Sequence, residues 1–319
     1  MSSRPSIAVS RHAEKLCHIY HQKLAGGSFA AVLGSHFVKM TRLTTTGSSF
    51  QFTLDERLTL QNKCLSVSAA LALFDDLSTI GFMGADACSR PGVSVHLQTE
   101  LLKLVPAGTN LTLNCFIDKI GKTMGFTSME LVLTDSPLTL VARGTHIKFL
   151  PLGSWIMDSV VLQPAVLGPL INYGLYDDGS NIFTRLGLAA PFVKKINYDP
   201  STTASAYETL GLTPIAGSSG AMQTKVHQAL CNPMSSMHGG AVAMAAEYTS
   251  ATCAKPAGTE SGEVGVEMQL TYLSALTKDI VVEATADPQT ATTRGLLRRA
   301  QQSQPAVTFA LRYGNLTPL

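Results

Sequence analysis

The sequence predicts an α+β protein in which two copies of one domain follow each other along the chain. Each copy is expected to be a curved antiparallel sheet wrapped around a central helix. Three observations lead to this prediction: an internal repeat, an almost wholly apolar central helix in each copy, and a meander of strands after each helix. The 319 residues, 45% of them hydrophobic, suffice for two domains of moderate size.

The repeat is clearest in two segments that alternate apolar and polar residues as strands do. Residues 93–114 (VSVHLQTELLKLVPAGTNLTLN) align with residues 264–285 (VGVEMQLTYLSALTKDIVVEAT), which matches Val93 with Val264 and Gln98 with Gln269. Upstream, FAAVLG at 29–34 aligns with AYETLG at 206–211. We therefore predict a first domain with an N-terminal helix over 1–150, a Pro-, Gly- and Asn-rich linker over 151–204, and a second domain over 205–319.

The two central helices are expected in SVSAALALFDDLSTIGF (66–82) and GGAVAMAAEYTSAT (239–252). A helix that is apolar on nearly all faces must be covered nearly all round. A strongly curved sheet can do this, and pairing the two copies edge to edge would hide the remaining open edge. The expected arrangement is therefore an intrachain pseudo-dimer.

Composition excludes several classes of function. A net charge of +2 with 14% charged residues implies no nucleic-acid surface. The six cysteines show no CxxC spacing, which favours free thiols over a disulfide frame or a zinc site. The apolar runs are shorter than the roughly 18 residues that a membrane span needs. We expect no metal, no cofactor and no membrane span.

The first 24 residues carry more basic than acidic side chains. Arg4, Arg11, Lys15 and Lys23 stand against Glu14. This balance is typical both of a mitochondrial presequence and of a surface helix that leads into the first domain. Mitochondrial localisation, or otherwise cytoplasmic localisation, is the resulting expectation.

Four segments of the first half resemble, in order and spacing, the PaaI-type acyl-CoA thioesterases, which have the hotdog fold. They are FDDLST (74–79), PGVSV (91–95), IGKTMGFTSMEL (120–131) and ARGTHIKFL (142–150). The second half resembles the family more loosely, but it alone contains the family's HGG triplet, which begins at His238. The resemblance implies tandem hotdog folds and hydrolysis of acyl-CoA to free acid and CoA, with coenzyme A only as part of the substrate.

In this family the sites lie where two hotdog domains meet. Carried over by position, the resemblance implies one composite site made of Asn232, His238 and the Gly239 N–H from the second half with Asp75 and Ser94 from the first.

The complementary positions have diverged from the family pattern. Glu247 follows His238 by nine residues and lies about 12 Å along a helix from the glycines, so it cannot share a small reacting group with them. Ser66, Val67 and Ser68 stand where the first half would need HGG, and Gly265 stands where the second half would need the serine. With Asn62, Glu247 marks a possible degenerate second site.

Thioester hydrolysis needs an activated water and a donor for the carbonyl oxygen. Gly239 at a helix start has an N–H with no intrahelical acceptor, and its missing side chain permits close approach. A desolvated Asp75 would have a raised pKa and serve as general base or nucleophile, with Ser94 and Asn232 orienting water or carbonyl. The neighbouring Asp76 is interpreted as an ordinary polar position of the helix.

Coenzyme A would bring phosphates to the rim of the site. The candidate cationic partners are Lys119, Lys122, Arg143, Lys148 and Arg298.

A second hypothesis is a catalytically silent hotdog pseudo-dimer that serves as a structural subunit of a larger, mitochondrial complex. A third, a hotdog hydratase, is suggested only by Asn232 followed by Pro233, and the histidine follows too late for that family. A homodimer of chains is also expected, because hotdog pseudo-dimers often pair again.

Overall fold

The computed structural model describes residues 14, 17, 29–34, 38–60, 63–86, 90–150, 176–177, 193–194, 205–232, 236–253, 263–287 and 289–319. The first half contains α2 (Phe29–Val32), β1 (Lys39–Thr44), β2 (Gly47–Thr53), η4 (Glu56–Leu58), α3 (Val67–Ala85), β3 (Val93–Leu101), β4 (Asn110–Ile120), β5 (Met124–Leu133) and β6 (Leu140–Phe149). A short parallel pair, β7 (Tyr176–Asp177) and β8 (Val193–Lys194), follows.

The second half repeats the order of the first. It contains α6 (Ala206–Thr209), β9 (Thr213–Pro214), β10 (Ala221–Lys225), η7 (Gln228–Leu230), α7 (Gly239–Cys253), β11 (Val264–Tyr272), β12 (Asp279–Asp287), β13 (Thr292–Arg299) and β14 (Val307–Gly314). The expected succession of short helix, strands, central helix and meander is present in both halves.

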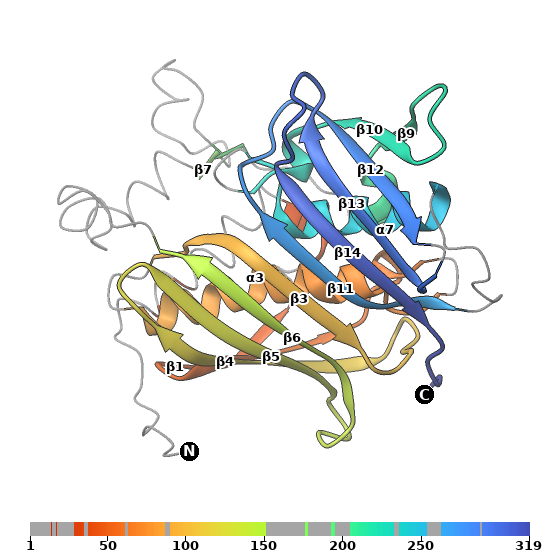
Figure 1. The fold of residues 1–319 in the computed structure, drawn as a ribbon. Coiled ribbons are helices and arrows are strands. Elements are labelled where there is room, and N and C mark those ends of the chain that lie inside the picture. Colours follow the sequence, from red (N-terminus) through yellow and green to blue (C-terminus); the bar gives the residue numbers. More distant parts are fainter. Residues whose placement is uncertain are drawn as a thin grey trace.

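All strands except β7 and β8 join one antiparallel sheet of 12 strands, in the order β1-β2-β4-β5-β6-β3-β11-β14-β13-β12-β10-β9. Six neighbouring strands come from each half, and the order in the second half mirrors that in the first (Figure 1). The halves join where β3 pairs with β11, with Gln98 opposite Gln269. The inner edge of each half is thereby closed by the other half.

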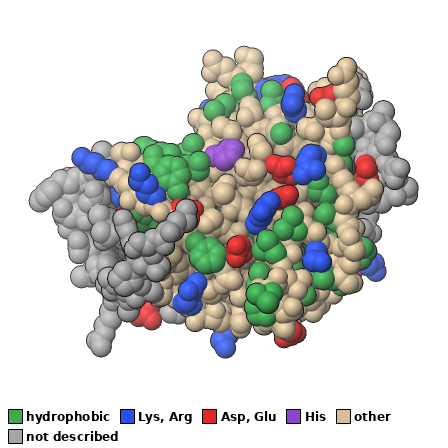
Figure 2. Space-filling view, turned by 60° about the horizontal axis from the view of Figure 1, so that its bottom comes forward, with side chains coloured by type: hydrophobic (Ala, Val, Ile, Leu, Met, Phe, Trp, Pro, Cys, Tyr) green, Lys and Arg blue, Asp and Glu red, His purple; other side chains and the backbone are tan. Residues whose placement is uncertain are grey.

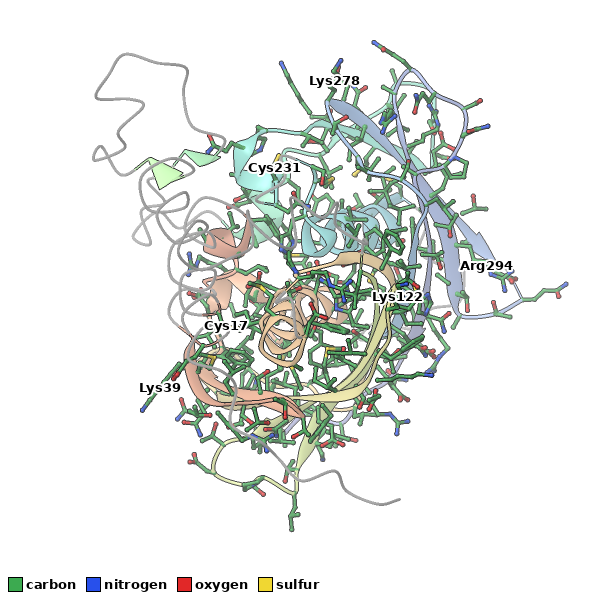
Figure 3. All side chains as sticks on the ribbon, turned by 90° about the vertical axis from the view of Figure 1, so that its left-hand side faces the viewer. Cys17, Lys39, Lys122, Cys231, Lys278 and Arg294 are labelled. Atoms are coloured by element: carbon green, nitrogen blue, oxygen red, sulfur yellow. The ribbon has the colours of Figure 1, made fainter. Side chains whose placement is uncertain are left out.

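The sheet curves around α3, as the view along this helix in Figure 3 shows. Nearly every residue of α3 is buried, and α3 packs against both the sheet and α7. One apolar core therefore runs through both halves, with Phe50 and Phe74 from the first and Met244 and Leu270 from the second.

Among the described residues, α3 is long and apolar enough by length and composition to cross a membrane, but it is wholly buried inside the protein. Core helices of this kind pass the same test, and the observation is compatible with the expected lack of a membrane span.

The short leading helix of each half packs on the opposite half. The Phe29 N–H of α2 donates to the Cys231 carbonyl oxygen after η7 at 2.9 Å, and α6 packs against η4. The Phe29 ring lies 5.7 Å from the His238 ring between centroids. Each leading helix therefore covers the start of the other half's central helix.

Most of the N-terminal segment and of the linker, on which the presequence and domain-boundary predictions depend, falls outside the described residues. Glu14 and Cys17 are helical, and Cys17 is buried with its Sγ 3.4 Å from the Ile80 carbonyl oxygen of α3. The chain therefore already reaches the core at Cys17. The five described cysteines are free thiols.

Gly240 at the start of α7 is required by the contact between the two central helices. A Cβ atom there would lie 2.6 Å from the Ala72 Cβ and 2.9 Å from the Ala72 Cα. The missing side chain at this glycine therefore serves helix packing.

We predict that Gly240→Ala lowers the free energy of unfolding by about 1–3 kcal/mol, because the added methyl group overpacks the α3–α7 contact. In Ala72→Gly/Gly240→Ala the methyl group moves to the other helix, so the double variant should lose less than the sum of the two single changes. Urea denaturation of all three variants measures this coupling. Strict additivity would contradict the proposed contact.

Candidate active site

Asp75 and Gly239 face each other across the contact between the two halves. Asp75 lies in the middle of α3 and is 5% exposed, and Gly239 is the first residue of α7. A Cβ atom on Gly239 would overlap the Asp75 Oδ2 and lie 2.9 Å from the Tyr272 hydroxyl oxygen. That hydroxyl donates to the Gly239 carbonyl oxygen at 3.1 Å. A larger residue at this point would have to displace the Asp75 carboxylate and the Tyr272 hydroxyl.

The Gly239 N–H is the first orphan donor of α7, and no acceptor for it is found among the described residues. It lies at the positive end of the helix dipole. An oxygen with developing negative charge beside Asp75 would be stabilised by this N–H.

Asp75 Oδ1 is held by a directed chain of hydrogen bonds. The Ser94 hydroxyl on β3 donates to it at 2.8 Å, so Ser94 must accept from the Nε2–H of His146, at 3.0 Å. His146 Nδ1 is then an acceptor for the Ser78 hydroxyl at 2.7 Å. Every donor in the chain points toward Asp75, and the imidazole is neutral with its proton on Nε2.

The second carboxylate oxygen of Asp75 faces the start of α7. His238 Nδ1 lies 3.5 Å from Asp75 Oδ2 and accepts the Gly240 N–H at 3.0 Å, which caps the helix. His238 Nε2 lies 3.7 Å from Asp76 Oδ1. Asp76 is only 4% exposed, so the interpretation of Asp76 as an ordinary polar position was wrong.

A buried lysine completes the charge balance. Lys148 on β6 is 3% exposed, and its ammonium donates to the Thr79 hydroxyl oxygen at 2.7 Å, one turn after Asp75 on α3. Burial lowers the pKa of Lys148 to about 8, against the opposing pull of Asp75 and Asp76. A cation is therefore present beside two buried carboxyl groups at neutral pH.

The expected upward shift of the Asp75 pKa was wrong. Burial favours a higher pKa, but electrostatic interactions with His238, His146 and Lys148 and the Ser94 hydrogen bond hold it below its ordinary value. Burial lowers the pKa of His146 to about 3, so His146 is neutral near pH 7. When His238 is neutral and accepts the Gly240 N–H, the cation that keeps Asp75 ionised is Lys148.

The predicted partners of Asp75 differ in how closely the structure brings them to it. Ser94, His238 and Gly239 all lie against its carboxylate. The Asn232 side chain instead bonds within its own loop: its Nδ2 donates to the Ser236 Oγ at 2.9 Å, and its Oδ1 accepts the Ser236 N–H at 3.2 Å. Asn62 lies outside the described residues.

Glu247 occupies the mirrored position on α7, and it is surrounded by hydroxyl groups. Its Oε2 accepts the Ser68 hydroxyl, the Ser68 N–H at 3.3 Å and the Tyr207 hydroxyl at 3.1 Å. The Tyr207 hydroxyl also bonds to Ser66 and Ser68. A Cβ atom on Gly265 would lie 2.9 Å from Glu247 Oε1. The Glu247 position is thus filled from every side by the protein itself.

The cationic residues that we expected at the rim of the site differ in burial and in ion pairing. Lys148 is buried, as above, whereas Lys119 and Lys122 are exposed on and beside β4. Arg143 pairs with Glu100 at 2.6 Å and Arg298 with Glu283 at 2.6 Å. Figure 2 shows cationic and anionic side chains interspersed over one face of the molecule. No dense cationic patch is visible on that face.

His146 and the buried position of Lys148 were missed from the sequence. Both lie in ARGTHIKFL, and the alternation of β6 puts His146 and Lys148 on its buried face. Strand alternation in the sequence could have predicted that both side chains are buried. The pairing of Ser94 with Lys148 across β3 and β6 then brings this face of β6 to the site.

Among the described residues, no three His, Cys, Asp or Glu side chains are grouped so that they could hold a metal ion.

Comparison with solved structures places this fold among thioesterases. The 12:0-ACP thioesterase from Umbellularia californica is 9% identical, with 83% of this chain and 96% of that chain covered and a TM-score of 0.52. A protein assigned as a thioesterase from Novosphingobium aromaticivorans is 14% identical, with 87% and 98% covered and a TM-score of 0.50. Zebra fish thioesterase superfamily member 2 is 21% identical, with 44% and 100% covered and a TM-score of 0.41.

No protein-family model and no curated protein sequence matches the chain significantly. The similarity to the first two structures extends over most of both chains, and at these identities it concerns the fold. The large antiparallel sheet with its few helices is therefore the hotdog fold found in these thioesterases.

We predict that Glu247→Gln changes how stability depends on pH. Burial raises the pKa of Glu247 above its ordinary value of 4.5, although the surrounding donors oppose this. The folded protein therefore binds this proton more tightly than the unfolded chain, and the stability that protonated Glu247 confers is lost as pH rises through the folded pKa. From about pH 4.5 up to the folded pKa, the free energy of unfolding of the variant should rise relative to that of wild type. Above the folded pKa the difference between the two should stay constant. Urea titrations at several pH values measure it, and a difference independent of pH would contradict a raised pKa.

Proposed function

We propose that this protein is an acyl-CoA thioesterase with one composite site, which the two hotdog halves of an intrachain pseudo-dimer form together. The observation that carries the proposal is the position of the Asp75 carboxylate of the first half against the start of α7 of the second half at Gly239. The hotdog fold shared with thioesterases supports the reaction class.

The proposed reaction uses water and needs no other reactant. Asp75 takes a proton from a water molecule as that water forms a bond to the thioester carbonyl carbon. The carbonyl oxygen gains negative charge and is stabilised by the Gly239 N–H, a type of contact worth about 2.7–4 kcal/mol. The C–S bond then breaks, the free acid forms, and the proton on Asp75 passes to the departing thiolate.

The lowered pKa of Asp75 fits a base that is ionised throughout the neutral range. Its Oδ1 is fixed by Ser94, so Oδ2, on the Gly239 side, is the oxygen that accepts the proton. The chain from Ser78 through His146 to Ser94 holds Oδ1 in place, which supports this assignment.

One working site per chain follows from the difference between the two carboxylates. In the alignment of FAAVLG with AYETLG, Tyr207 corresponds to Ala30. The Tyr207 hydroxyl occupies the Glu247 side, whereas Ala30 brings no polar group to the Asp75 side. Glu247 is in our proposal the remnant of a second site.

The alternative is a catalytically silent structural subunit. The hydrogen bonds that surround Glu247 support a purely structural role for one of the two positions. If the Asp75 position did the same, the fold would act as a building block within a larger assembly.

A panel of acyl-CoAs and the same acyl groups on acyl carrier protein should reveal hydrolysis by release of free thiol. We predict that Asp75→Asn lowers kcat/KM by about 10²–10⁴, the usual contribution of a general base. Glu247→Gln, which neutralises the mirrored carboxyl group, is the matched control and should keep wild-type activity. Well-folded wild type that releases no thiol from any substrate would favour the silent subunit.

The hydrogen-bond chain behind Ser94 gives a second test. The register of β14 on β11 places Leu311 where β6 has His146, so His146→Leu copies the second half. We predict a fall in kcat of about 10- to 100-fold with little change in KM, because a carboxylate misplaced by about 1 Å loses this much. The neighbouring exposed Thr145→Ala is the control, and an unchanged kcat in His146→Leu would remove His146 from the mechanism.

A further inference from the structure

His238 stands between a donor and an acceptor that compete for one ring nitrogen. Its Nδ1 accepts the Gly240 N–H at 3.0 Å and also lies 3.5 Å from Asp75 Oδ2. A neutral ring can satisfy the Gly240 N–H with the Nδ1 lone pair. A doubly protonated ring has no lone pair there, and its Nδ1–H faces Asp75 instead.

These two states have opposite consequences for the proposed base. With neutral His238, the ring offers no proton to Asp75 Oδ2, and this oxygen can accept one from water. With protonated His238, Nδ1–H bonds to Oδ2 while Ser94 already holds Oδ1. Both oxygens of the base are then engaged, and the Gly240 N–H loses its capping acceptor.

Asp76 is placed to control which state is present. Its Oδ1 lies 3.7 Å from His238 Nε2, and the side chain is buried beside Asp75 on α3. A carboxylate at this position attracts a proton to Nε2, which leaves the lone pair on Nδ1 in the neutral ring. The corresponding position of α7 in the second half is Tyr248, whose ring lies 6.3 Å from that of Tyr207 between centroids. The arrangement is therefore specific to the Asp75 side.

The groups around the His238 ring come from several elements. Asp75 and Asp76 of α3 are negative, Lys148 of β6 is positive, the Phe29 ring of α2 is apolar, and the Tyr272 hydroxyl of β11 is neutral and committed to Gly239. Burial lowers the pKa of His238, but Asp76 and Asp75 outweigh burial and Lys148, so the pKa lies above its ordinary value.

We propose that Asp76 is a positioning residue, which fixes the Nε2–H tautomer of His238, keeps Asp75 Oδ2 open to water, and sets the pH below which protonated His238 closes it. The inference rests on the proposed thioesterase function for its effect on catalysis. The protonation states of His238 do not depend on that function and can be measured separately.

The test compares Asp76→Asn, which keeps an acceptor but loses the charge, with Asp76→Ala, which loses both. In ¹⁵N-detected NMR of the full chain, wild-type His238 should show the Nε2–H tautomer at high pH, and its titration should move to lower pH in Asp76→Asn. Exposed Asp135→Asn is the control and should leave the titration in place. An unmoved titration in Asp76→Asn would overturn the proposal.

Thioesterase activity gives the second readout. The acid limb of the kcat profile should follow the His238 titration to lower pH in Asp76→Asn. In Asp76→Ala the plateau should fall by about 10- to 100-fold, because the ring is no longer held. An acid limb that stays in place while the His238 titration moves would refute the closing of Asp75 by His238. Absence of thiol release in wild type together with a moved titration would refute the proposed function and leave the tautomer assignment intact.

Discussion

The structure depends on how it satisfies a carboxyl group buried in an almost wholly apolar helix. Asp75 and Glu247 are 5% and 2% exposed, and neither α3 nor α7 can supply hydrogen-bond donors to its own acid from within the helix. An uncompensated buried charge costs several kcal/mol. In each case donors come from the start of the opposite helix or from side chains packed around the contact. Glu247 thus takes a donor from the opposite half through Ser68, whereas Asp75 is held by Ser94 of its own half and faces His238 of the other.

The buried carboxyl groups of Asp75 and Glu247 are stabilised in different ways. Asp75 is compensated by charge: buried Lys148 and His238 lie near it, and its pKa is lowered. Glu247 is surrounded by the hydroxyls of Ser68 and Tyr207, and its pKa is raised. A compensated carboxylate stays ionised and can act as a base wherever His238 is neutral, whereas a carboxyl group that tends to keep its proton serves packing. The same fold position thus favours chemistry in one half and structure in the other.

Much of the fold could be predicted from the sequence because the repeat and the strand alternation are periodic. The alignment of the two copies matches Gln98 with Gln269, and these two residues lie opposite each other where β3 pairs with β11. The residues around the site were harder, because they depend on which strand faces which helix turn. Lys148 was expected at the rim on charge alone, yet strand alternation buries it. The Asp75 pKa was predicted with the wrong sign, because burial was considered without the cations that accompany it.

A single chain permits an asymmetry that a homodimer of identical hotdog subunits could not have. In a homodimer of identical subunits, the same residue stands at the start of the central helix in both sites. A substitution of glycine there would therefore change both sites at once. Here Gly239 and Gly240 begin α7, while Val67 and Ser68 begin α3. Ser68 can then bond to Glu247 without affecting the space beside Asp75. Because the two halves are covalently linked, their sequences can differ. The contact at Glu247 can then be filled with hydrogen-bonding side chains that add stability, while the contact at Asp75 keeps the glycines.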